Sequence, residues 1–425
     1  MLDIKFIRDN PEVVKEAVRI KGFSVDIDRL LTVDEELREC KGKVDNLRAE
    51  KNSVSREIPQ LGEREREVAV ERVRQVKEEL AVLEQKMGDL QHIFETLMLQ
   101  VPSVPLPEVP LGVGEEDNVE VRAWGDKPKF GFEMRDHLEL AEMLDIVDVP
   151  RAVKFAGSRT YALKNEGVLL EHAILRFALD YLLERGFTAV SPPLLVRERA
   201  MMGTGYFPLG KEQAYYIGED DLFLIGTSEV PLVALHQDEI LSYRELPIQY
   251  AGYSYCFRRE AGTYGKDTRG LYRVHQFRKV EQVVFCRDDA EEAEKIHQEI
   301  LANAEGIMQA MELPYRVTLA CTGEIGIGQV KKHEVEAWMP SREAYSETHS
   351  CSTLNDFQSR RLNIKFRDSD GKSRFVYTLN NTAIATPRVM IPLLENNQNE
   401  DGSVNIPAVI QPYMNGQKRL EPKGK

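Results

Sequence analysis

Apolar residues recur at alternating steps of three and four over two long stretches of the chain, with polar and charged residues between them. This spacing is that of a coiled coil, in which a narrow apolar seam runs along one side of each helix. Residues 59–62 contain Pro and Gly and separate the two stretches, so the pattern predicts an antiparallel helical hairpin over about residues 27–98. Each helix would be roughly 45 Å long at about 1.5 Å per residue. The seam positions are Leu30, Val33, Leu37, Cys40, Val44, Leu47, Val54 and Ile58, then Val73, Val76, Leu80, Leu83, Met87, Leu90, Phe94, Leu97 and Val101, with Lys51 as the one break.

Short segments on either side of the hairpin mark its limits. Before it, Asn10 suits the cap of a short helix, Pro11 its first position and Gly22 its end. After it, four prolines within residues 101–112 exclude helix and central strand. The predicted division is therefore an N-terminal helical domain over 1–100, a linker over 101–118, a second domain over 119–416, and a polar, basic and loose tail over 417–425.

The second domain alternates helical and extended patterns, which predicts an α+β fold. Residues 171–185 and 290–311 read as helices, and residues 215–224 and 315–320 as strands. Residues 249–257 and 280–285 are rich in β-branched and aromatic side chains and predict two further strands. Glycines at 262, 265 and 270 supply turns between these last two.

Composition narrows the class of protein. The chain has 425 residues, 42% apolar and 30% charged, which is typical of globular proteins with more than one domain. It has no run of eighteen apolar residues and no apolar signal sequence at its start, so we expect no membrane contact and a cytoplasmic location. Its five cysteines are scattered without a Cys-x-x-Cys pair, so neither structural zinc nor disulfides are expected.

Charge is distributed unevenly along the chain. The net charge is −14, yet residues 258–279 hold seven basic and two acidic side chains. These lie on the glycine-rich hairpin between the two predicted strands, and arginine's planar fork binds phosphate bidentately. A polyphosphate site is therefore favoured over a solvated charged hairpin.

The predicted coiled coil is also polarised. Residues 38–77, the half nearer the turn, carry eleven basic and eight acidic side chains, whereas the other half carries two basic and nine acidic. A solvated coiled coil without a partner is the common explanation for such patterns. Contact with an RNA backbone is favoured here, because the basic end is the one remote from the second domain.

Five segments, in order, resemble the motifs of class II aminoacyl-tRNA synthetases, and their amino-acid sequences are similar to those of the bacterial seryl-tRNA synthetases. The likeness extends from Met1 to about Gly416. It implies an antiparallel sheet flanked by helices, and a homodimer with motif 1 at its interface. The segments are Gly186-Phe-Thr-Ala-Val-Ser-Pro-Pro193 (motif 1), Thr227-Ser228-Glu229, Phe257-Arg-Arg-Glu-Ala-Gly262 through His275-Gln-Phe277 (motif 2), Glu347-Thr-His-Ser350, and Leu379-Asn-Asn-Thr382-Ala-Ile-Ala-Thr-Pro-Arg388 (motif 3).

The resemblance implies an ATP site. Arg258 matches the arginine that bridges the α-phosphate and the substrate carboxylate, Glu260 the acceptor of the adenine amino group, and Phe277 the ring that stacks on adenine. Arg388 would cover the opposite adenine face or meet the γ-phosphate. Arg258, Glu347 and Arg388 are the residues expected to be catalytic. The full ATP set implied by the motifs is Arg258, Arg259, Glu260, Arg269, Arg273, Val274, Phe277, Glu347, Thr348, His349, Ser350 and Arg388.

Glu347 and Ser350 match positions that hold Mg²⁺ on the ATP phosphates, and oxygen ligands completed by substrate phosphate suit this ion. His349 lies between them. One histidine among oxygen ligands is poor support for a metal ligand, so a packing role or a contact with the tRNA end is favoured for it.

The resemblance also implies a serine site. Thr227, Ser228 and Glu229 match the segment that binds the ammonium, and Glu281 the acid that reads the hydroxyl, with Thr382 nearby. The full set is Thr227, Ser228, Glu229, Arg258, Glu281 and Thr382. A site built to hydrogen-bond a hydroxyl rejects alanine strongly, because its polar groups would be left unpaired.

Motif 3 departs from the family pattern. Many relatives have Gly-Ser-Gly where this chain has Asn381-Thr382-Ala383, and Gly at Pro387. Threonine keeps the hydroxyl of serine, so the role of Thr382 is retained, whereas proline before Arg388 could change the rotamer of that arginine.

The helical arm of this family binds the long variable arm of tRNA(Ser), and the family also charges tRNA(Sec). The candidate RNA contacts, taken as a group, are Arg48, Lys51, Arg56, Arg64, Arg66, Arg72 and Arg74. Two alternatives stay open: a synthetase for another amino acid, such as threonine or proline, and an inactive paralogue that binds tRNA or acts as a scaffold. The long arm and Glu281 disfavour the first, and the intact motif residues disfavour the second.

Overall fold

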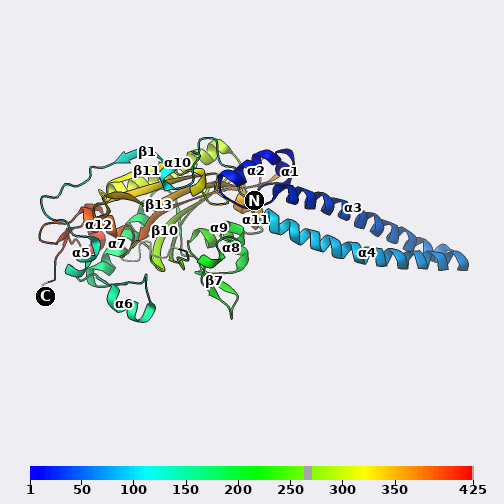
Figure 1. The fold of residues 1–425 in the computed structure, drawn as a ribbon, viewed down its shortest axis with the longest axis horizontal. Helices are drawn as coiled ribbons and strands as arrows, with labels where there is room; N and C mark the ends of the chain where they lie inside the picture. Colours follow the sequence, from blue (N-terminus) through cyan, green and yellow to red (C-terminus); the bar gives the residue numbers. More distant parts are fainter. Residues whose placement is uncertain (263–269, 424–425) are drawn as a thin grey trace. The chain divides into compact units, whose positions relative to one another are not determined.

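The structure, a computed structural model, describes residues 1–262 and 270–423 and divides the chain into two compact units (Figure 1). The first unit comprises Leu2–Pro102, and the second extends from Ser103 to the C-terminus. The linker prolines lie at this division, where residues 101–114 form neither helix nor strand.

The first unit is helical, and its long hairpin confirms the predicted coiled coil. Buried seam residues pair across the two long helices, Val33 and Cys40 with Leu90 and Val44 with Val76 and Leu80, as antiparallel helices require. Figure 1 shows these helices, α3 and α4, side by side along their length. The elements are α1 (Ile4–Asp9), α2 (Pro11–Ile20), α3 (Ile27–Glu57), the 3-10 turn η1 (Ile58–Gln60) and α4 (Glu63–Met98).

Two caps illustrate how these helices begin. Asp26 accepts a hydrogen bond from the Arg29 amide at the start of α3, as a capping carboxylate does. Asn10 stands at the cap position of α2 and Pro11 at its first position, as predicted, but the Asn10 side chain does not cap the helix, because its amide donates to the Phe6 carbonyl. The preceding helix α1, which ends at Asp9, supplies that carbonyl and competes for the side chain.

The second unit is built on an eight-stranded sheet that is antiparallel except at one edge, which confirms the α+β class. Strand order is β1-β11-β12-β13-β16-β10-β9-β4, and only β4 pairs in parallel with its neighbour. The strands are β1 (Val119–Trp124), β11 (Tyr315–Leu319), β12 (Lys331–Met339), β13 (Ala344–Asn355), β16 (Tyr377–Thr386), β10 (Gln276–Cys286), β9 (Ile248–Phe257) and β4 (Thr188–Val190). The predicted strands of motif 2 are β9 and β10, paired without interruption from Phe285↔Ile248 to Gln276↔Phe257.

Helices cover one face of this sheet and enclose the main core. Leu170, Ile174, Ile300 and Leu301 of α7 and α10 pack with Val284 and other side chains of the sheet in one buried cluster. The opposite face is polar only where the site described below lies; farther along β10, Val283 and Phe285 of that face pack with Leu232 of α9 and Leu362 of α11 in a second buried cluster. The helices are α5 (His137–Met143), α6 (Val149–Ala156), α7 (Asn165–Leu183), α8 (Glu198–Thr204), α9 (Glu229–Ala234), α10 (Ala290–Ala310), α11 (Phe357–Leu362) and α12 (Met390–Asn396).

Smaller sheets surround the main one. They comprise β5 (Leu195–Val196), β7 (Leu222–Leu224) and β6 (Tyr216–Ile217); β15 (Ser373–Phe375), β14 (Lys365–Arg367) and β8 (Ile240–Ser242); β2 (Val147–Asp148) with β3 (Ala162–Leu163); and β17 (Val404–Asn405) with β18 (Arg419–Leu420). The last pair corrects the prediction of a loose tail. Leu420 pairs with Val404 and is buried, and the Lys423 ammonium binds Glu166, so residues 417–423 are held in place.

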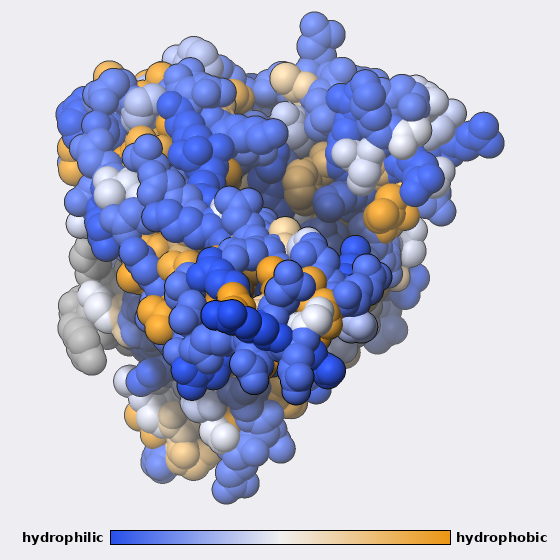
Figure 2. Space-filling model, turned by 90° about the vertical axis from the view of Figure 1, so that its right-hand side faces the viewer, coloured by the Kyte–Doolittle hydropathy of each residue, from blue (hydrophilic) through white to orange (hydrophobic). Residues whose placement is uncertain are grey.

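The surface is mainly hydrophilic on the face shown in Figure 2, with hydrophobic residues in small groups. Scattered exposed apolar side chains are usual for proteins and identify no site by themselves. Among residues 1–262 and 270–423, no helix combines the length and the apolar content needed to cross a membrane.

Candidate functional site

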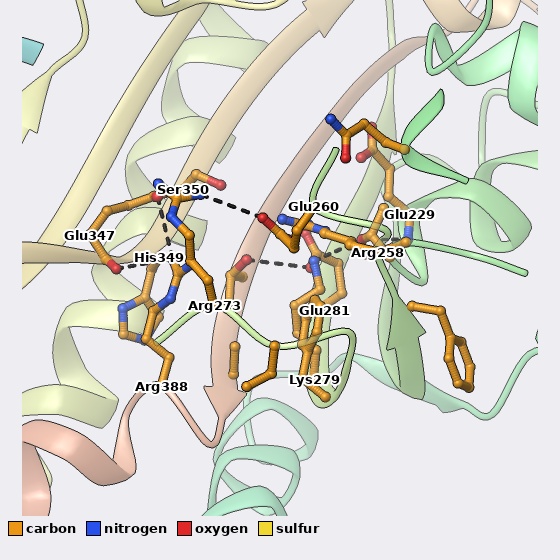
Figure 3. A pocket seen from close by; sticks show the side chains of 18 of the residues that line it. Glu229, Arg258, Glu260, Arg273, Lys279, Glu281, Glu347, His349, Ser350 and Arg388 are labelled. Atoms are coloured by element: carbon orange, nitrogen blue, oxygen red, sulfur yellow. Dashed lines mark hydrogen bonds and ion pairs between the residues drawn. The ribbon is translucent and has the colours of Figure 1, made fainter. Parts of the chain in front are cut away.

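The polar face of the sheet forms one wall of a cavity of about 480 Å³ in the second unit. Strand β10 contributes Phe277, Lys279 and Glu281, which share a face because side chains alternate along a strand. Figure 3 shows Glu347 and Arg388 on one side of the cavity and Glu229 and Arg258 on the other. The charged and polar lining comprises Tyr206, Gln213, Thr227, Glu229, Arg258, Glu260, Tyr272, Arg273, Lys279, Glu281, Gln329, Glu347, Thr348, His349, Ser350, Ser352, Asn380, Thr382, Thr386 and Arg388.

Glu229 is fixed by three donors at the first turn of α9. Gln358 Nε2 and Asn380 Nδ2 donate to its Oε1 at 2.8 and 2.9 Å, and the Tyr206 hydroxyl donates to its Oε2 at 3.1 Å. Burial, and next the negative charge of Glu281, raise the pKa of Glu229 to about 7. A carboxylate so enclosed is ready to accept a cationic group, which would remove the electrostatic cost of its charge.

Glu281 lies beside Glu229 and is 2% exposed. It forms a short ion pair with Lys279 Nζ, which also donates to Thr227 Oγ1 at 2.7 Å. Thr382 Oγ1, directly opposite on β16, donates to Glu281 at 3.5 Å. Two carboxylates and an ammonium thus meet in one buried space.

Arg258 closes this end of the cavity at the end of β9. Its Nε donates to the Gly226 carbonyl at 3.2 Å, and its guanidinium carbon is 5.2 Å from the Phe277 ring centroid. The remaining guanidinium donors are thereby directed along a wall that carries both an aromatic face and the carboxylates. An anion and a flat ring could both be held here.

Glu347 and Arg388 form the other end. Arg388 Nη1 donates to the Glu347 carbonyl at 3.1 Å and to its carboxylate at 3.4 Å, and Arg388 Nε donates to the Tyr272 carbonyl at 3.2 Å. The Glu347 side chain is 42% exposed. Its place in the cleft would by itself raise the pKa of Glu347, but Arg388, Lys332 and Arg258 together hold that pKa below its ordinary value. Glu347 is therefore ionised.

The oxygen groups of this end fit a hard cation only in part. Glu347 and Ser350 both lie on β13 and both line the cavity. In the described part of the chain, no group of three His, Cys, Asp or Glu side chains is placed to hold a metal ion. A Mg²⁺ ion here would need phosphate oxygens of a ligand to complete its shell, which is the usual way this ion binds with nucleotides.

His349 is buried between these two residues. Its Nδ1 is 2.8 Å from Thr348 Oγ1, and burial lowers the pKa of His349 to about 4, so the ring is neutral at physiological pH. Its Nε2 has no hydrogen-bond partner among the described residues. Thr348 Oγ1 also donates to the carbonyl of Val335 on the neighbouring strand β12. The side chains of Thr348 and His349 therefore contribute to packing within the sheet as well as to the cavity wall.

Most of the residues predicted for the site meet at this one cavity, although they come from segments between 227 and 388. Two do not line it. The Ser228 hydroxyl is buried and donates to the Gly252 carbonyl, which fixes the start of α9 on β9, and Arg259 joins the site only through its neighbours. Arg269, predicted for the ATP site, lies outside the described residues.

Several residues of the site were not predicted. Lys279 and Asn380 lie two positions from Glu281 and Thr382, so the alternation of strand side chains could have found them. Tyr206 and Gln358 carry no such signal, because they reach Glu229 from segments far away in the sequence.

The basic side chains of the hairpin lie on its solvent-facing surface. Three of the seven are engaged within the arm, as Arg48 pairs with Glu84, Arg72 with Glu50 and Arg74 with Glu71, each at 2.7 Å. Exposed pairs of this kind contribute only about 0–1 kcal/mol, so a phosphate can displace them. The other four, Lys51, Arg56, Arg64 and Arg66, form no ion pair with the described residues.

Comparisons with known proteins agree with this division. Residues 1–105 match the seryl-tRNA synthetase N-terminal domain, and residues 215–397 match the tRNA synthetase class II core domain (G, H, P, S and T). The chain is 46% identical to a serine–tRNA ligase of Deinococcus radiodurans over 420 residues, with 99% of each chain covered, and 43% identical to one of Symbiobacterium thermophilum, with 97% and 98% covered.

Solved structures are similar over the whole length. The crystal structure of seryl-tRNA synthetase from Pyrococcus horikoshii complexed with ATP has a TM-score of 0.92 and 40% identity, with all of both chains covered. A cytoplasmic serine–tRNA ligase from Naegleria fowleri in complex with AMP has a TM-score of 0.85 and 29% identity, with 100% and 99% covered.

Proposed function

The chain belongs to the seryl-tRNA synthetase family and is a serine–tRNA ligase, and on this premise we propose that its cavity activates serine with ATP. The observation that carries the proposal is the gathering of Glu229, Arg258 and Glu281 at one end of a single cavity and of Glu347 and Arg388 at the other. The first end suits an amino acid and the second a nucleotide.

The first step joins serine to AMP. An oxygen of the serine carboxylate attacks the α-phosphorus, the bond to the pyrophosphate oxygen breaks, and pyrophosphate leaves with that electron pair. The protein supplies no nucleophile and moves no proton, so its task is to align the reactants and to neutralise charge. Arg258 is suited to bridge the carboxylate and the α-phosphate, because it lines the cavity and, among the described residues, only its Nε is hydrogen-bonded, to the Gly226 carbonyl.

The nucleotide would lie with its adenine between Phe277 and Arg388. Arg388 already donates to the carbonyls of Tyr272 and Glu347, and its guanidinium carbon lies 4.2 Å from the centroid of the Tyr272 ring, so only its other flat face could meet a purine ring. Glu260 would accept from the adenine amino group. Arg273, 3.6 Å from Glu260, is suited to the phosphates, with Val274, Thr348, His349 and Ser350 as further walls, and Arg259 and Arg269 as loop contacts.

Glu347 and Ser350 would hold Mg²⁺ together with the ATP phosphates. The ion supplies positive charge to the phosphate oxygens when bound. Arg388 and Lys332 keep Glu347 ionised, which preserves an oxygen ligand of full charge at this wall.

Serine would bind with its ammonium at Glu229 and the Thr227 segment and its hydroxyl at Glu281 and Thr382. The buried carboxylate of Glu229 gains a counter-charge from the ammonium. The short side chain of serine would place its hydroxyl next to Glu281, which is 2% exposed. A ligand without a hydroxyl would offer this buried carboxylate no donor.

In the second step a ribose hydroxyl of the terminal adenosine attacks the acyl carbon of seryl-adenylate, and AMP leaves. We assign recognition of tRNA(Ser), and of tRNA(Sec), to the basic surface of the α3–α4 hairpin, in particular to Lys51, Arg56, Arg64 and Arg66. We propose a cytoplasmic location, because the proposed substrates are those of translation.

A homodimer is the proposed assembly. Motif 1 forms β4, an edge strand of three residues, next to α7. On α6 and the start of α7, Phe155, Val168 and Leu169 are 83%, 37% and 43% exposed, an apolar group that a second copy would cover.

The test is ATP–pyrophosphate exchange without tRNA across the twenty amino acids. Exchange with serine alone is expected. Exchange with another amino acid would leave the fold in place but overturn the assignment of the serine residues, and exchange with none, by folded protein in Mg²⁺, would indicate a tRNA-binding protein without activation.

A further inference from the structure

Lys279 is a buried lysine that the reaction described above does not use. It is 5% exposed, it lines the cavity, and its ammonium is tied to Thr227 Oγ1 and to the Glu281 carboxylate. Burial of an ammonium is costly even when it is paired. Two hydrophobic residues in place of Lys279 and Glu281 would pack at a lower cost in free energy, so a buried charged pair here needs a further reason.

The charges around Lys279 are balanced. Glu229 and Glu281 are both buried at this end, and Arg258 and Lys279 are the cations that face them. Tyr206 and Cys256 are the other titratable groups near this end, and both stay neutral because burial, first of all, raises their pKa values. These side chains together are therefore close to neutral, and a zwitterionic amino acid would bind among them without a change in net charge.

An ammonium has three N–H donors. In the part of the chain that the structure describes, two of those on Lys279 are directed at Thr227 and Glu281, which leaves one for a ligand in the cavity. A carboxylate accepts only, and a hydroxyl both donates and accepts. A serine hydroxyl that donates to Glu281 thus needs a neighbouring donor for its own oxygen.

We propose that Lys279 is a specificity-determining residue that donates to the oxygen of the serine hydroxyl while Glu281 accepts its hydrogen. This inference rests on the proposed serine site and deepens it. Lys279 and Glu281 together recognise both the oxygen and the hydrogen of the hydroxyl. Alanine has neither a donor nor an acceptor at this position, and the thiol of cysteine is only a weak donor and acceptor. Threonine carries the same hydroxyl and must be excluded by shape elsewhere.

The test substitutes methionine, which is similar in length but apolar. Lys279→Met is expected to raise the serine KM in pyrophosphate exchange by about tenfold or more and to lower the serine:alanine ratio of kcat/KM by a similar factor. The ATP KM and the serine:threonine ratio should stay within about twofold. An unchanged serine:alanine ratio in a folded variant would overturn the proposal.

Lys331→Met is the matched control. Lys331 is also 5% exposed and also ion-paired, with Glu294 and Glu108, but it does not line the cavity. Its loss should lower the melting temperature without a change in the serine:alanine ratio. If both variants alter selectivity equally, the effect at Lys279 is structural and the proposal fails.

Two further variants keep the outcomes separate. Glu281→Gln tests the proposed serine site itself: if it leaves the serine KM unchanged, the site is wrong, whereas a change there with none in Lys279→Met refutes only the present inference. Should Lys279→Met fail to fold, Lys279→Leu decides, because leucine has no donor, and a serine:alanine ratio within about twofold of wild type in that variant would contradict the assignment.

Discussion

Glu229 is the residue whose titration should be visible in the activity. Burial and Glu281 raise its pKa to about 7, and only the ionised form attracts an ammonium. The serine KM is therefore expected to fall several-fold as the pH rises from 6 to 8. Below the pKa of Glu229 the change is at most about tenfold per pH unit. The ATP KM should change little, and pyrophosphate exchange at fixed saturating ATP measures both.

Glu229→Gln provides the comparison for that profile. Its amide oxygen can still accept from Gln358 and Asn380, and its NH2 group can donate to the Tyr206 hydroxyl, but it carries no charge, so the serine KM should be high and flat with pH. The same group bears on stability. Its folded pKa exceeds the ordinary value of 4.5, so the folded state binds more protons between about pH 4.5 and 7, and its contribution to stability is lost as the pH rises through this window. A wild-type serine KM without pH dependence would contradict the role of Glu229.

Arg258 is expected to matter for chemistry rather than for folding. Arg258→Ala removes the group that would neutralise the α-phosphate, and kcat for exchange should fall by at least about 100-fold. Arg316→Ala is the control, since Arg316 is also partly buried and ion-paired, with Glu336, but does not line the cavity. Thermal melts should show both variants folded. Near-normal exchange by Arg258→Ala would exclude it from the reaction centre.

At the level of single residues, the sequence predicted those cavity residues that lie within continuous sequence motifs. Phe277 and Glu281 were assigned from the resemblance to the family, and both lie on one face of β10; Lys279 between them was overlooked although strand alternation includes it. Tyr206 and Gln358 could not be found, because their hydrogen bonds with Glu229 arise only when distant segments fold together. Arg259 was assigned from its place in the motif, but it lies beyond the end of β9, its amide donates to the Gln213 carbonyl, and it does not line the cavity.

Among the larger elements, the α3–α4 hairpin should bind RNA through charge. Arg64 and Arg66 are exposed near the turn and form no ion pair with the described residues. The double variant Arg64→Ala/Arg66→Ala is expected to weaken tRNA binding and to reduce the slope of log affinity against log salt by about 0.7–0.9 for every phosphate that is no longer neutralised. Filter binding at four salt concentrations measures this, while serine-dependent exchange should be unchanged.

Lys86→Ala is the control on the same helix. Lys86 is exposed on α4 in the acidic half of the arm and, among described residues, has no ion pair. Its loss should leave affinity and slope as in the wild type. Equal effects of the two changes would mean that RNA senses only the overall charge of the chain, and no effect of either would remove the arm from tRNA recognition.

Long periodic elements were the most predictable part of the fold. The seam from Leu30 to Leu97 fixed both helices of the hairpin, because one apolar stripe repeated over many turns has a single way to be buried. The tail was predicted wrongly, since composition alone suggested solvent. Leu420 finds a partner strand at Val404, and such a pairing over two residues leaves no periodic signal in the sequence.

For the whole molecule, the central question is whether a second copy covers the apolar group on α6 and α7. A stable interface buries at least about 1,000 Å² and places apolar residues at its centre. Leu169 is 43% exposed in that group. Leu169→Glu would bury an unpaired carboxylate in the interface, which costs several kcal/mol, so the assembly should dissociate at micromolar concentration.

Light scattering coupled to size-exclusion chromatography measures the outcome. The wild type should have about twice the 48.5 kDa mass of one chain, and Leu169→Glu about that mass itself, with its melt showing a folded protein. Val82→Glu is the control, because Val82 is 71% exposed on α4 and belongs to the other unit. A wild type of single-chain mass would refute the dimer. If the Leu169→Glu variant were still dimeric, the interface would involve neither α7 nor motif 1.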